Sequence, residues 1–328
     1  MRPAAHRLAT ALVLAALLHA TTTAAQGPAP PAQSASGLPA LDLPALDITE
    51  IAPGVYLHAG KLEDWLPTNG GDVANLAFIV GSRCVAVIDT GGTPQLGRRW
   101  RATIERSTRL PICYVIDTHA HPDHVLGNAA FVSPDTRFVG SARFNAAMAA
   151  RAPYFLRALQ RDFGVSAAPE SVVYPTIAVD GTRELDLGGR TLVVQAWPTS
   201  HTDNDLTVYD RSTRTLFTSD LLFVQHIPVV DGNLRGWLAT LQQLARIDAA
   251  LIVPGHGPTR RAGPEAWAPQ QEYLETLRRE TRAAIKSGKT LSQAVDSVGT
   301  QAASRWQLAE RFHRRNVTAA FAELEWED

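Results

Sequence analysis

The sequence predicts an α/β fold over most of the chain, followed by a small C-terminal helical extension. Short apolar runs bounded by turn residues, which are typical of buried strands, recur between about residues 47 and 260. Segments with helical periodicity alternate with them, as in residues 96–107. After Pro264 only helical periodicity remains. We therefore divide the chain into an α/β domain at 47–260 and a helical extension at 261–328.

The α/β domain contains a strand–helix–strand unit, because the apolar runs 84–88 and 112–116 flank the helical segment 96–107. Further helices are expected at 141–150, 152–163 and 236–246. The expected strands are 55–57, 76–80, 84–88, 112–116, 137–139, 191–196, 206–209, 215–217 and 251–253.

The helical extension is expected to pack on the α/β domain rather than do chemistry, because it carries apolar stripes and no cluster of metal-ligand residues. Gly288 is expected to end its first helix. Thr290 and Gln293 have the spacing of a capping box that begins the next one. A last helix is expected at 306–324. The expected anchors are Trp306, Phe312 and Phe321.

The N-terminus has the layout of a secretory signal peptide at residues 1–25. Arg2 and Arg7 precede an apolar stretch, and small residues lead to Ala25. The stretch is too short and Ala-rich to make a stable membrane span, although a retained anchor is the alternative. A Pro/Ala-rich linker follows at 26–46. We expect a secreted, periplasmic protein.

Composition narrows the function classes. Apolar residues make up 45% of the chain, enough for a sizeable core. The net charge is -1, and no basic face or charge run suggests nucleic acid as a partner. Cys84 and Cys113 each lie in a strand-like run, where two separate buried thiols are the favoured interpretation. A disulfide is the alternative, since an exported protein permits one but adjacent strands rarely give suitable geometry.

The strongest chemical signal is the segment Thr118-His119-Ala120-His121-Pro122-Asp123-His124, directly after the expected strand 112–116. His119 and His121 alternate in a tight loop and can project to one side, while Asp123 and His124 turn toward a second point nearby. Imidazole nitrogens and carboxylate oxygens are ligands that Zn²⁺ accepts. A purely structural role would require many buried hydrogen-bond partners. The segment therefore predicts a metal site.

Three further ligand-type residues each follow an apolar strand. His201 comes after 191–196, Asp220 after 215–217 and His256 after 251–253. A single His or Asp in a turn is usually solvated, but three in addition to the cluster favour one common site. Glycines on both sides of His256 allow the backbone to approach a metal closely.

The order H-x-H-x-D-H, then His, Asp and His, resembles the metallo-β-lactamase superfamily over about residues 47–260. The Asp89-Thr90-Gly91 turn matches it too. The resemblance implies an αβ/βα sandwich, in which two mixed β-sheets pack together with helices outside. It implies Zn²⁺ as the cofactor, two ions per chain, and Asp89 and Asp117 as carboxylates that orient ligand imidazoles. His119, His121 and His201 would hold the first metal, Asp123, His124 and His256 the second, and Asp220 would bridge both.

Details of the pattern narrow the resemblance. Asp220 stands where the commonest zinc β-lactamases have a Cys ligand, which favours the glyoxalase II, lactonase and phosphodiesterase type of dinuclear site. Residues 220–232, and the tail segment 313–317 with 323–325, resemble the quinoprotein relay system zinc metallohydrolases. That resemblance implies an exported protein associated with a periplasmic quinoprotein dehydrogenase system.

The function expected from these residues is that of a dinuclear zinc hydrolase. A metal-bridging hydroxide would cleave an ester, lactone, lactam, thioester or similar bond of a small-molecule substrate, with Asp123 and Asp220 as the catalytic carboxylates. One alternative is an oxidoreductase similar to the mononuclear iron persulfide dioxygenases. Another is a non-catalytic quinoprotein accessory factor.

Two more residues are expected near the pocket. His226 follows Asp220 on a loop and would line the pocket, an ordinary surface histidine being the alternative. Trp65, in the polar loop 60–75, would cover the metals or serve as a partly buried anchor.

Overall fold

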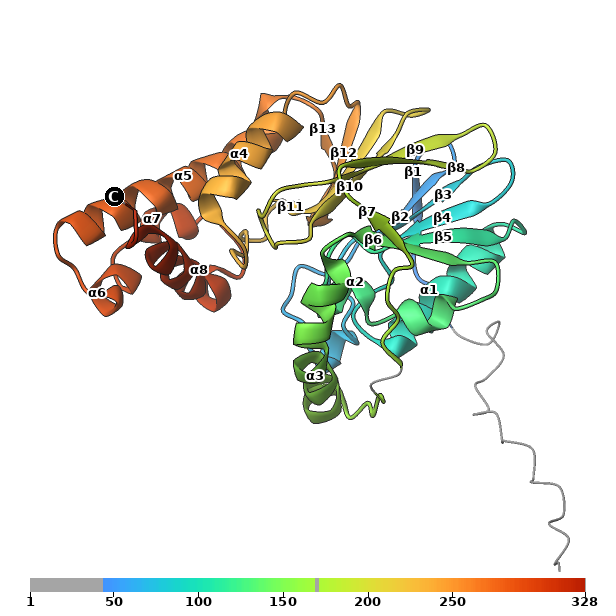
Figure 1. Cartoon of the computed structure of the whole chain (residues 1–328), viewed down its shortest axis with the longest axis horizontal. Helices are drawn as coiled ribbons and strands as arrows, with labels where there is room; N and C mark the ends of the chain where they lie inside the picture. Colours follow the sequence, from blue (N-terminus) through green and yellow to red (C-terminus); the bar gives the residue numbers. More distant parts are fainter. Residues whose placement is uncertain (1–43, 169–170, 328) are drawn as a thin grey trace, which may run out of the picture. The chain divides into compact units, whose positions relative to one another are not determined.

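Two β-sheets face each other in the computed structural model, which describes residues 44–168 and 171–327 (Figure 1). The expected signal peptide and nearly all of the linker lie outside these residues. The first sheet has the order β1-β2-β3-β4-β5-β6-β7, and the second β13-β12-β11-β10-β9-β8. Strand bounds in the first sheet are β1 Thr49–Ala52, β2 Val55–His58, β3 Leu76–Val80, β4 Val85–Ile88, β5 Ile112–Ile116, β6 Arg137–Ser141 and β7 Ile177–Val179. Those in the second are β8 Thr182–Asp186, β9 Thr191–Ala196, β10 Leu206–Asp210, β11 Thr215–Phe223, β12 Leu251–His256 and β13 Arg260–Arg261.

Both sheets are mixed, as predicted. The first is antiparallel from β1 to β4 and parallel from β4 to β7. In the second, β11 and β12 form the parallel pair. Parallel neighbours bring the carboxyl ends of their strands to the same edge of a sheet, which is where loops can assemble a site.

The helices lie outside the two sheets. Their bounds are α1 Pro94–Ser107, α2 Pro122–Val125, α3 Phe144–Phe163, α4 Leu234–Leu244, α5 Pro264–Lys286, α6 Leu291–Val295, α7 Thr300–Ala303 and α8 Ala309–Leu324, with 3₁₀ turns η2 Pro67–Asn69 and η3 Asn128–Phe131. The Thr290–Gln293 capping box is present at the start of α6. In Figure 1, α4 to α8 gather beside β11 and β12. Within residues 44–168 and 171–327, no helix combines the length and apolarity needed to cross a bilayer.

The alternation of side chains along the strands explains the layers. Val85 and Val87 of β4 pack in one core with Trp100 of α1, whereas Ile88 belongs to the core between the sheets. The outer face of the second sheet is covered in the same way, since Leu216 of β11 packs in a core with α4 and α5. The order α1, first sheet, second sheet, α4 and α5 is the predicted αβ/βα sandwich.

The C-terminal helices share one apolar core with the second sheet. Leu274 and Leu277 of α5 and Val317 of α8 are fully buried in it, together with Trp237 of α4. Burial of side chains of this size stabilises the fold by about 1.5–3 kcal/mol each. These helices are therefore held against the α/β part of the chain by their apolar stripes.

One helix, α3, stands where two were expected at 141–150 and 152–163. Pro153 lies inside it rather than between two helices. An internal proline costs about 3 kcal/mol. Met148, Phe155 and Leu159 form one buried stripe on both sides of the proline, and the burial of this stripe offsets the cost.

Cys84 and Cys113 form a disulfide, with their Cα atoms 5.8 Å apart. The favoured interpretation as separate thiols was wrong. The reason lies in the pairing of β4 with β5, whose register shifts between Val85 and Ala86. Val85 pairs with Ile112 and Ala86 with Tyr114, so Cys113 is the extra residue of a bulge. The bulge supplies the geometry that regular neighbouring strands lack.

Candidate metal centre

Seven residues expected as ligands come together at one edge of the sandwich. The loop after β5 carries His119 and His121, and α2 begins there with Asp123 and His124 in its first turn. The other three come from the second sheet. His201 follows β9, Asp220 lies in β11 and His256 is the last residue of β12.

The sequence suggested that Asp220 follows a strand. In the structure it lies inside the strand β11. β11 continues to Phe223, but its pairing with β12 is irregular on both sides of Ser219. Ser219 has a φ of 45°, which is unusual for a residue other than glycine. Bulges re-aim side chains near sites, and here the bulge accompanies an Asp220 carboxylate directed at the histidines.

Gly255 makes room for that carboxylate. A Cβ at this position would lie 1.9 Å from Oδ1 of Asp220, so a larger residue would displace the side chain. Gly255 is thus needed because the backbone beside His256 lies close to the Asp220 carboxylate, rather than to a metal as the sequence had suggested.

The first group of candidate ligands consists of His119, His121, His201 and Asp220. Nδ1 of His121 lies 3.0 Å from Nε2 of His119 and 3.1 Å from Nε2 of His201. Oδ2 of Asp220 lies 3.3 Å from Nε2 of His201 and 3.8 Å from Nε2 of His119. Three imidazole nitrogens and one carboxylate oxygen therefore converge on one point.

The second group consists of Asp123, His124 and His256. Oδ2 of Asp123 lies 3.5 Å from Nε2 of His124 and 3.3 Å from Nε2 of His256. Asp220 reaches this group as well, because its Oδ1 lies 3.2 Å from Nε2 of His124. The two oxygens of Asp220 thus face both groups.

Each imidazole has a partner on its outward nitrogen. Nδ1 of His201 donates to the carbonyl of Val229 and Nδ1 of His256 to the carbonyl of Val73. Nδ1 of His124 lies 2.7 Å from Oδ2 of Asp89. With the outward nitrogen donating, the inward nitrogen keeps a lone pair for a metal, the arrangement found at metal-binding histidines.

Asp89 lies where a carboxylate that orients a ligand imidazole was expected, but Asp117 does not. Asp117 is buried and accepts a hydrogen bond from Nδ2 of Asn128, and it makes no hydrogen bond or ion pair with an imidazole in the described part of the chain. Its hydrogen-bond partner is the Asn128 amide rather than a ligand imidazole. Asp231, which sequence reasoning missed, takes this place, with Oδ2 3.0 Å from Nε2 of His121.

The electrostatics of the two groups differ. Burial, together with the neighbouring His124, holds the pKa of His119 well below its usual value. Burial also lowers the pKa of His201, to about 3. Burial lowers the pKa of His256 too, but the Asp220 and Asp123 carboxylates outweigh it and raise that pKa to about 9. A positive charge is therefore favourable in the second group, and either protons or a metal cation can supply it. A metal cation that binds there would release protons.

Unsatisfied atoms show that the donor set fits a metal. Nε2 of His124 and Oδ1 of Asp220 are buried, and neither makes a hydrogen bond to any residue the structure describes. Such orphaned atoms are costly in a protein interior. Both point into the space between the two groups, where imidazole and carboxylate donors suit a cation such as Zn²⁺.

A cavity of about 400 Å³ opens beside the two groups, and its lining includes His121, Asp123, His201, Asp220 and His256. His226 also lines it. Its side chain is buried and its ring centroid lies 5.0 Å from that of His256, so it is no surface histidine. Trp65 is both anchored and in the lining, because Nε1 donates to the carbonyl of Gly92 while the ring packs on Phe163.

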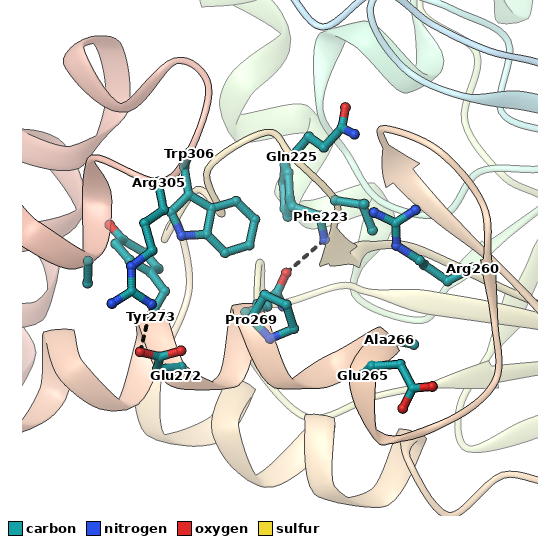
Figure 2. A pocket seen from close by; sticks show the side chains of 13 residues that line it. Phe223, Gln225, Arg260, Glu265, Ala266, Pro269, Glu272, Tyr273, Arg305 and Trp306 are labelled. Carbon is teal, nitrogen blue, oxygen red and sulfur yellow. Dashed lines mark hydrogen bonds and ion pairs between the residues drawn. The ribbon is translucent and has the colours of Figure 1, made fainter.

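Phe223 lines both this cavity and a second one of about 220 Å³, which Figure 2 shows. The ring of Phe223 stacks on His256 with centroids 5.2 Å apart. In the second cavity, Figure 2 shows Trp306 and Tyr273 on one side and Arg260 on the other. The seven candidate ligands do not line this second cavity. Of these two cavities, the candidate metal site therefore adjoins only the one of about 400 Å³.

Comparisons with known proteins agree with this geometry. The family model described as Metallo-beta-lactamase superfamily matches residues 69–256. A "Beta-lactamase-like protein 2 homolog" from Caenorhabditis elegans is 26% identical over 213 residues, 64% of this chain and 63% of that protein. A "Linear primary-alkylsulfatase" from Pseudomonas sp. (strain ATCC 19151) is 25% identical over 235 residues, 61% of this chain and 43% of that protein. The chain thus spans less than two thirds of both relatives.

Solved structures share the fold. A metallo-beta-lactamase from Pontibacter korlensis has a TM-score of 0.56 at 21% identity, covering 70% of this chain and 99% of its own. The stereoselective inverting sec-alkylsulfatase from Pseudomonas sp. has a TM-score of 0.63 at 16% identity, covering 86% of this chain and 50% of its own.

Two mixed sheets with outer helices and a ligand-rich edge define an αβ/βα sandwich protein with a candidate metal-binding site. Since the family model covers more than half of its residues, the chain belongs to the metallo-beta-lactamase superfamily. That superfamily is metal-dependent and its members are typically hydrolases.

Proposed function

We propose that this protein is an exported hydrolase with two zinc ions in its centre. The observation that carries the proposal is the position of Asp220. Its Oδ1 lies 3.2 Å from His124 and its Oδ2 3.3 Å from His201, so one carboxylate faces both groups. A carboxylate has two oxygens and can contact two ions at once. Imidazole and carboxylate donors without thiolate are compatible with zinc.

When bound, two zinc ions polarise the scissile group and supply a hydroxide nucleophile near neutral pH. The two carboxylates of the protein have different tasks. The Asp123 side chain is 16% exposed and lines the cavity, whereas that of Asp220 is 4% exposed. We assign the proton relay to the Asp123 carboxylate, which would accept a proton from water and return it to the leaving group. Asp220 holds the centre together.

The test is metal analysis together with a substrate panel. Purified protein should carry close to two zinc ions per chain and hydrolyse at least one ester, lactone, lactam, thioester or sulfate ester. Sulfate esters belong in the panel because two similar proteins are named alkylsulfatases. One iron ion without zinc, combined with oxygen consumption on a persulfide, would overturn the hydrolase.

Export is supported by the signal-peptide pattern of residues 1–25 and by the Cys84–Cys113 disulfide, because disulfides persist in oxidising compartments. N-terminal sequencing of the mature protein should begin near Gln26. An intact Met1 on mature protein would contradict this.

Association with a quinoprotein dehydrogenase system is supported by the two segments that resemble the relay-system hydrolases. Residues 220–232 and 313–317 contact each other, since Asn316 Oδ1 accepts a hydrogen bond from the amide of Val230. Cells lacking the protein should lose periplasmic quinoprotein dehydrogenase activity. Unchanged activity would remove this part of the proposal.

A further inference from the structure

The wall of the metal cavity next to His121 carries two arginines. Arg151 comes from α3 and Arg315 from α8, and they are the lysine or arginine side chains among the described residues that line this cavity. Both converge on Asp231. Nη2 of Arg151 lies 3.2 Å from Oδ2, and Nη2 of Arg315 lies 2.6 Å from Oδ1. Oδ2 of Asp231 also lies 3.0 Å from Nε2 of His121, so the arginines are connected to the first group through one carboxylate.

The two arginines carry more positive charge and more N–H donors than Asp231 can pair with. Two positive charges meet one negative charge, and each guanidinium carries five N–H donors. Nη1 of Arg151 is buried and has no hydrogen-bond partner within residues 44–168 and 171–327. Over half of the Arg315 side chain is exposed, 54%, with Asp231 as its charged partner. A surplus of one positive charge with unused donors, one of them buried, is an arrangement that suits an anion with several oxygens.

The rest of this wall is apolar and aromatic. Tyr154 and Phe155 of α3 and Phe312 of α8 line the cavity beside the arginines. Tyr154 is 58% exposed, although it is a large aromatic side chain. The lining also contains the acidic residues Glu63 and Asp64, and Asp64 is paired with Arg311 of α8 at 2.6 Å. Among the described residues, Arg151 and Arg315 are thus the cationic side chains of the lining, and they face no second carboxylate besides Asp231. An anionic group would find its cationic partners in these two arginines, and an apolar body could lie along the aromatic side chains.

We propose that Arg151 and Arg315 bind an anionic group, such as a carboxylate, that the substrate carries apart from the bond to be cleaved. The proposal rests on the hydrolase function and adds the substrate class to it. It makes the C-terminal helix α8 part of the substrate site. The expectation that the helical extension only packs on the fold is then incomplete, because Phe312 and Arg315 both reach the cavity.

The test measures binding and does not depend on turnover. Zinc-loaded protein is titrated calorimetrically with succinate, glutarate and adipate, each compared with its mono-amide. One carboxylate of each probe can engage the metal centre, so the diacid-to-monoamide ratio reports the second carboxylate. One charge-assisted contact is worth about 1.5 kcal/mol or more, so at least one diacid should bind roughly tenfold more tightly than its mono-amide.

The ratio of diacid affinity to mono-amide affinity should fall close to one in the variants Arg315→Gln and Arg151→Gln. Arg314→Gln is the matched control, since Arg314 lies on the same helix but pairs with the exposed Asp296. Each variant is also assayed for zinc, because arginines that only held Asp231 would lower zinc content without changing the ratio. If Arg315→Gln does not fold, Arg151→Gln gives the same test from another helix.

Equal binding of diacids and mono-amides by the native protein, or ratios unchanged in both variants, would overturn the anion site. Failure of the whole hydrolysis panel would instead remove the hydrolase function and leave the calorimetric result standing. The two proposals can therefore fail separately.

Discussion

The metal centre and the cluster of Tyr273, His313 and Asn316 between α5 and α8 are both buried groups of polar side chains, yet they differ in how their atoms are satisfied. In the Tyr273 cluster, the Tyr273 hydroxyl lies 2.9 Å from Nδ1 of His313 and accepts from Asn316, while Nε2 of His313 donates to the carbonyl of Val298. Asn316 also donates to the carbonyl of Pro228. All the polar side-chain atoms of this cluster have partners.

The metal centre leaves inward atoms without such partners, as His124 and Asp220 show. A buried histidine therefore indicates a metal site when its second ring nitrogen lies close to other potential ligand atoms. His313 has both nitrogens occupied by a hydroxyl and a carbonyl and therefore joins helices. His124 has one nitrogen on Asp89 and the other directed at carboxylates. The Tyr273 cluster should therefore govern stability, and the metal centre should govern metal binding.

The largest expected effect comes from Asp220→Asn. The substitution keeps the size of the side chain and removes the charge that faces both groups, so the two metals would repel each other more strongly. We expect kcat to fall by a factor on the order of 10² or more and metal content to drop below two per chain. Metal analysis and turnover on a panel substrate measure this. Two zinc ions with near-native turnover would refute the bridging role, and Asp296→Asn on the surface is the control.

The next effect concerns the carboxylate behind a ligand. Asp231→Asn leaves an oxygen that can accept from His121 but removes the charge that stabilises its position. Loss of such a partner typically costs about 10–100-fold in metal affinity. Competition with a chelator should show this weakening for one of the two ions. An unchanged affinity for both ions would mean that Asp231 serves the arginines alone.

Asn316→Ala should separate the two clusters. It removes hydrogen bonds to Pro228, Val230 and Tyr273. Leaving buried groups unpaired should lower the free energy of unfolding by about 1–3 kcal/mol. Zinc content should stay as in the native protein. Arg314→Ala, on the exposed side of α8, should change stability by less than about 0.5 kcal/mol. A loss of zinc with unchanged stability would reverse the assignment of roles.

The smallest expected effect is on pH dependence. Burial lowers the pKa of His313 below its ordinary value of 6.5. The unfolded chain therefore takes up a proton more readily than the folded one. The stability gained from neutral His313 is complete above pH 6.5 and is lost as the pH falls through the lower folded pKa. Denaturant unfolding at pH 7.5, 6.5 and 5.5 should show a shallower decline in His313→Gln. Identical declines in both proteins would contradict this.

The parts of the fold that sequence reasoning found are those with strong local signals. Buried strands such as β3 and β4 form continuous apolar runs. β8 was missed because four of its five residues are exposed and polar, with Leu185 alone buried. β13 is only two residues long. Edge strands like these are recognised through their neighbours, which a local pattern does not contain.

In the site, too, sequence reasoning found the residues with a local sequence signal and missed those that only the fold brings together. His119, His121, Asp123 and His124 lie within six residues of one another in the chain and formed a visible motif. Asp231 lies 110 positions from the histidine it contacts, and Arg315 comes from the segment expected only to pack. No spacing rule connects such positions, because the fold alone brings them together. Asp117, in contrast, looked well placed in sequence but is hydrogen-bonded to Asn128 instead of a ligand histidine.

Phe223 has a consequence for the reach of the active site. Phe223 lines both a cavity of about 400 Å³ that holds the candidate ligands and one of about 220 Å³ lined in part by the C-terminal helices. A smaller side chain at this position is expected to widen the metal cavity toward the space lined by Trp306. Position 223 is therefore a single site outside the seven candidate ligands at which a substitution should change the length of substrate that fits.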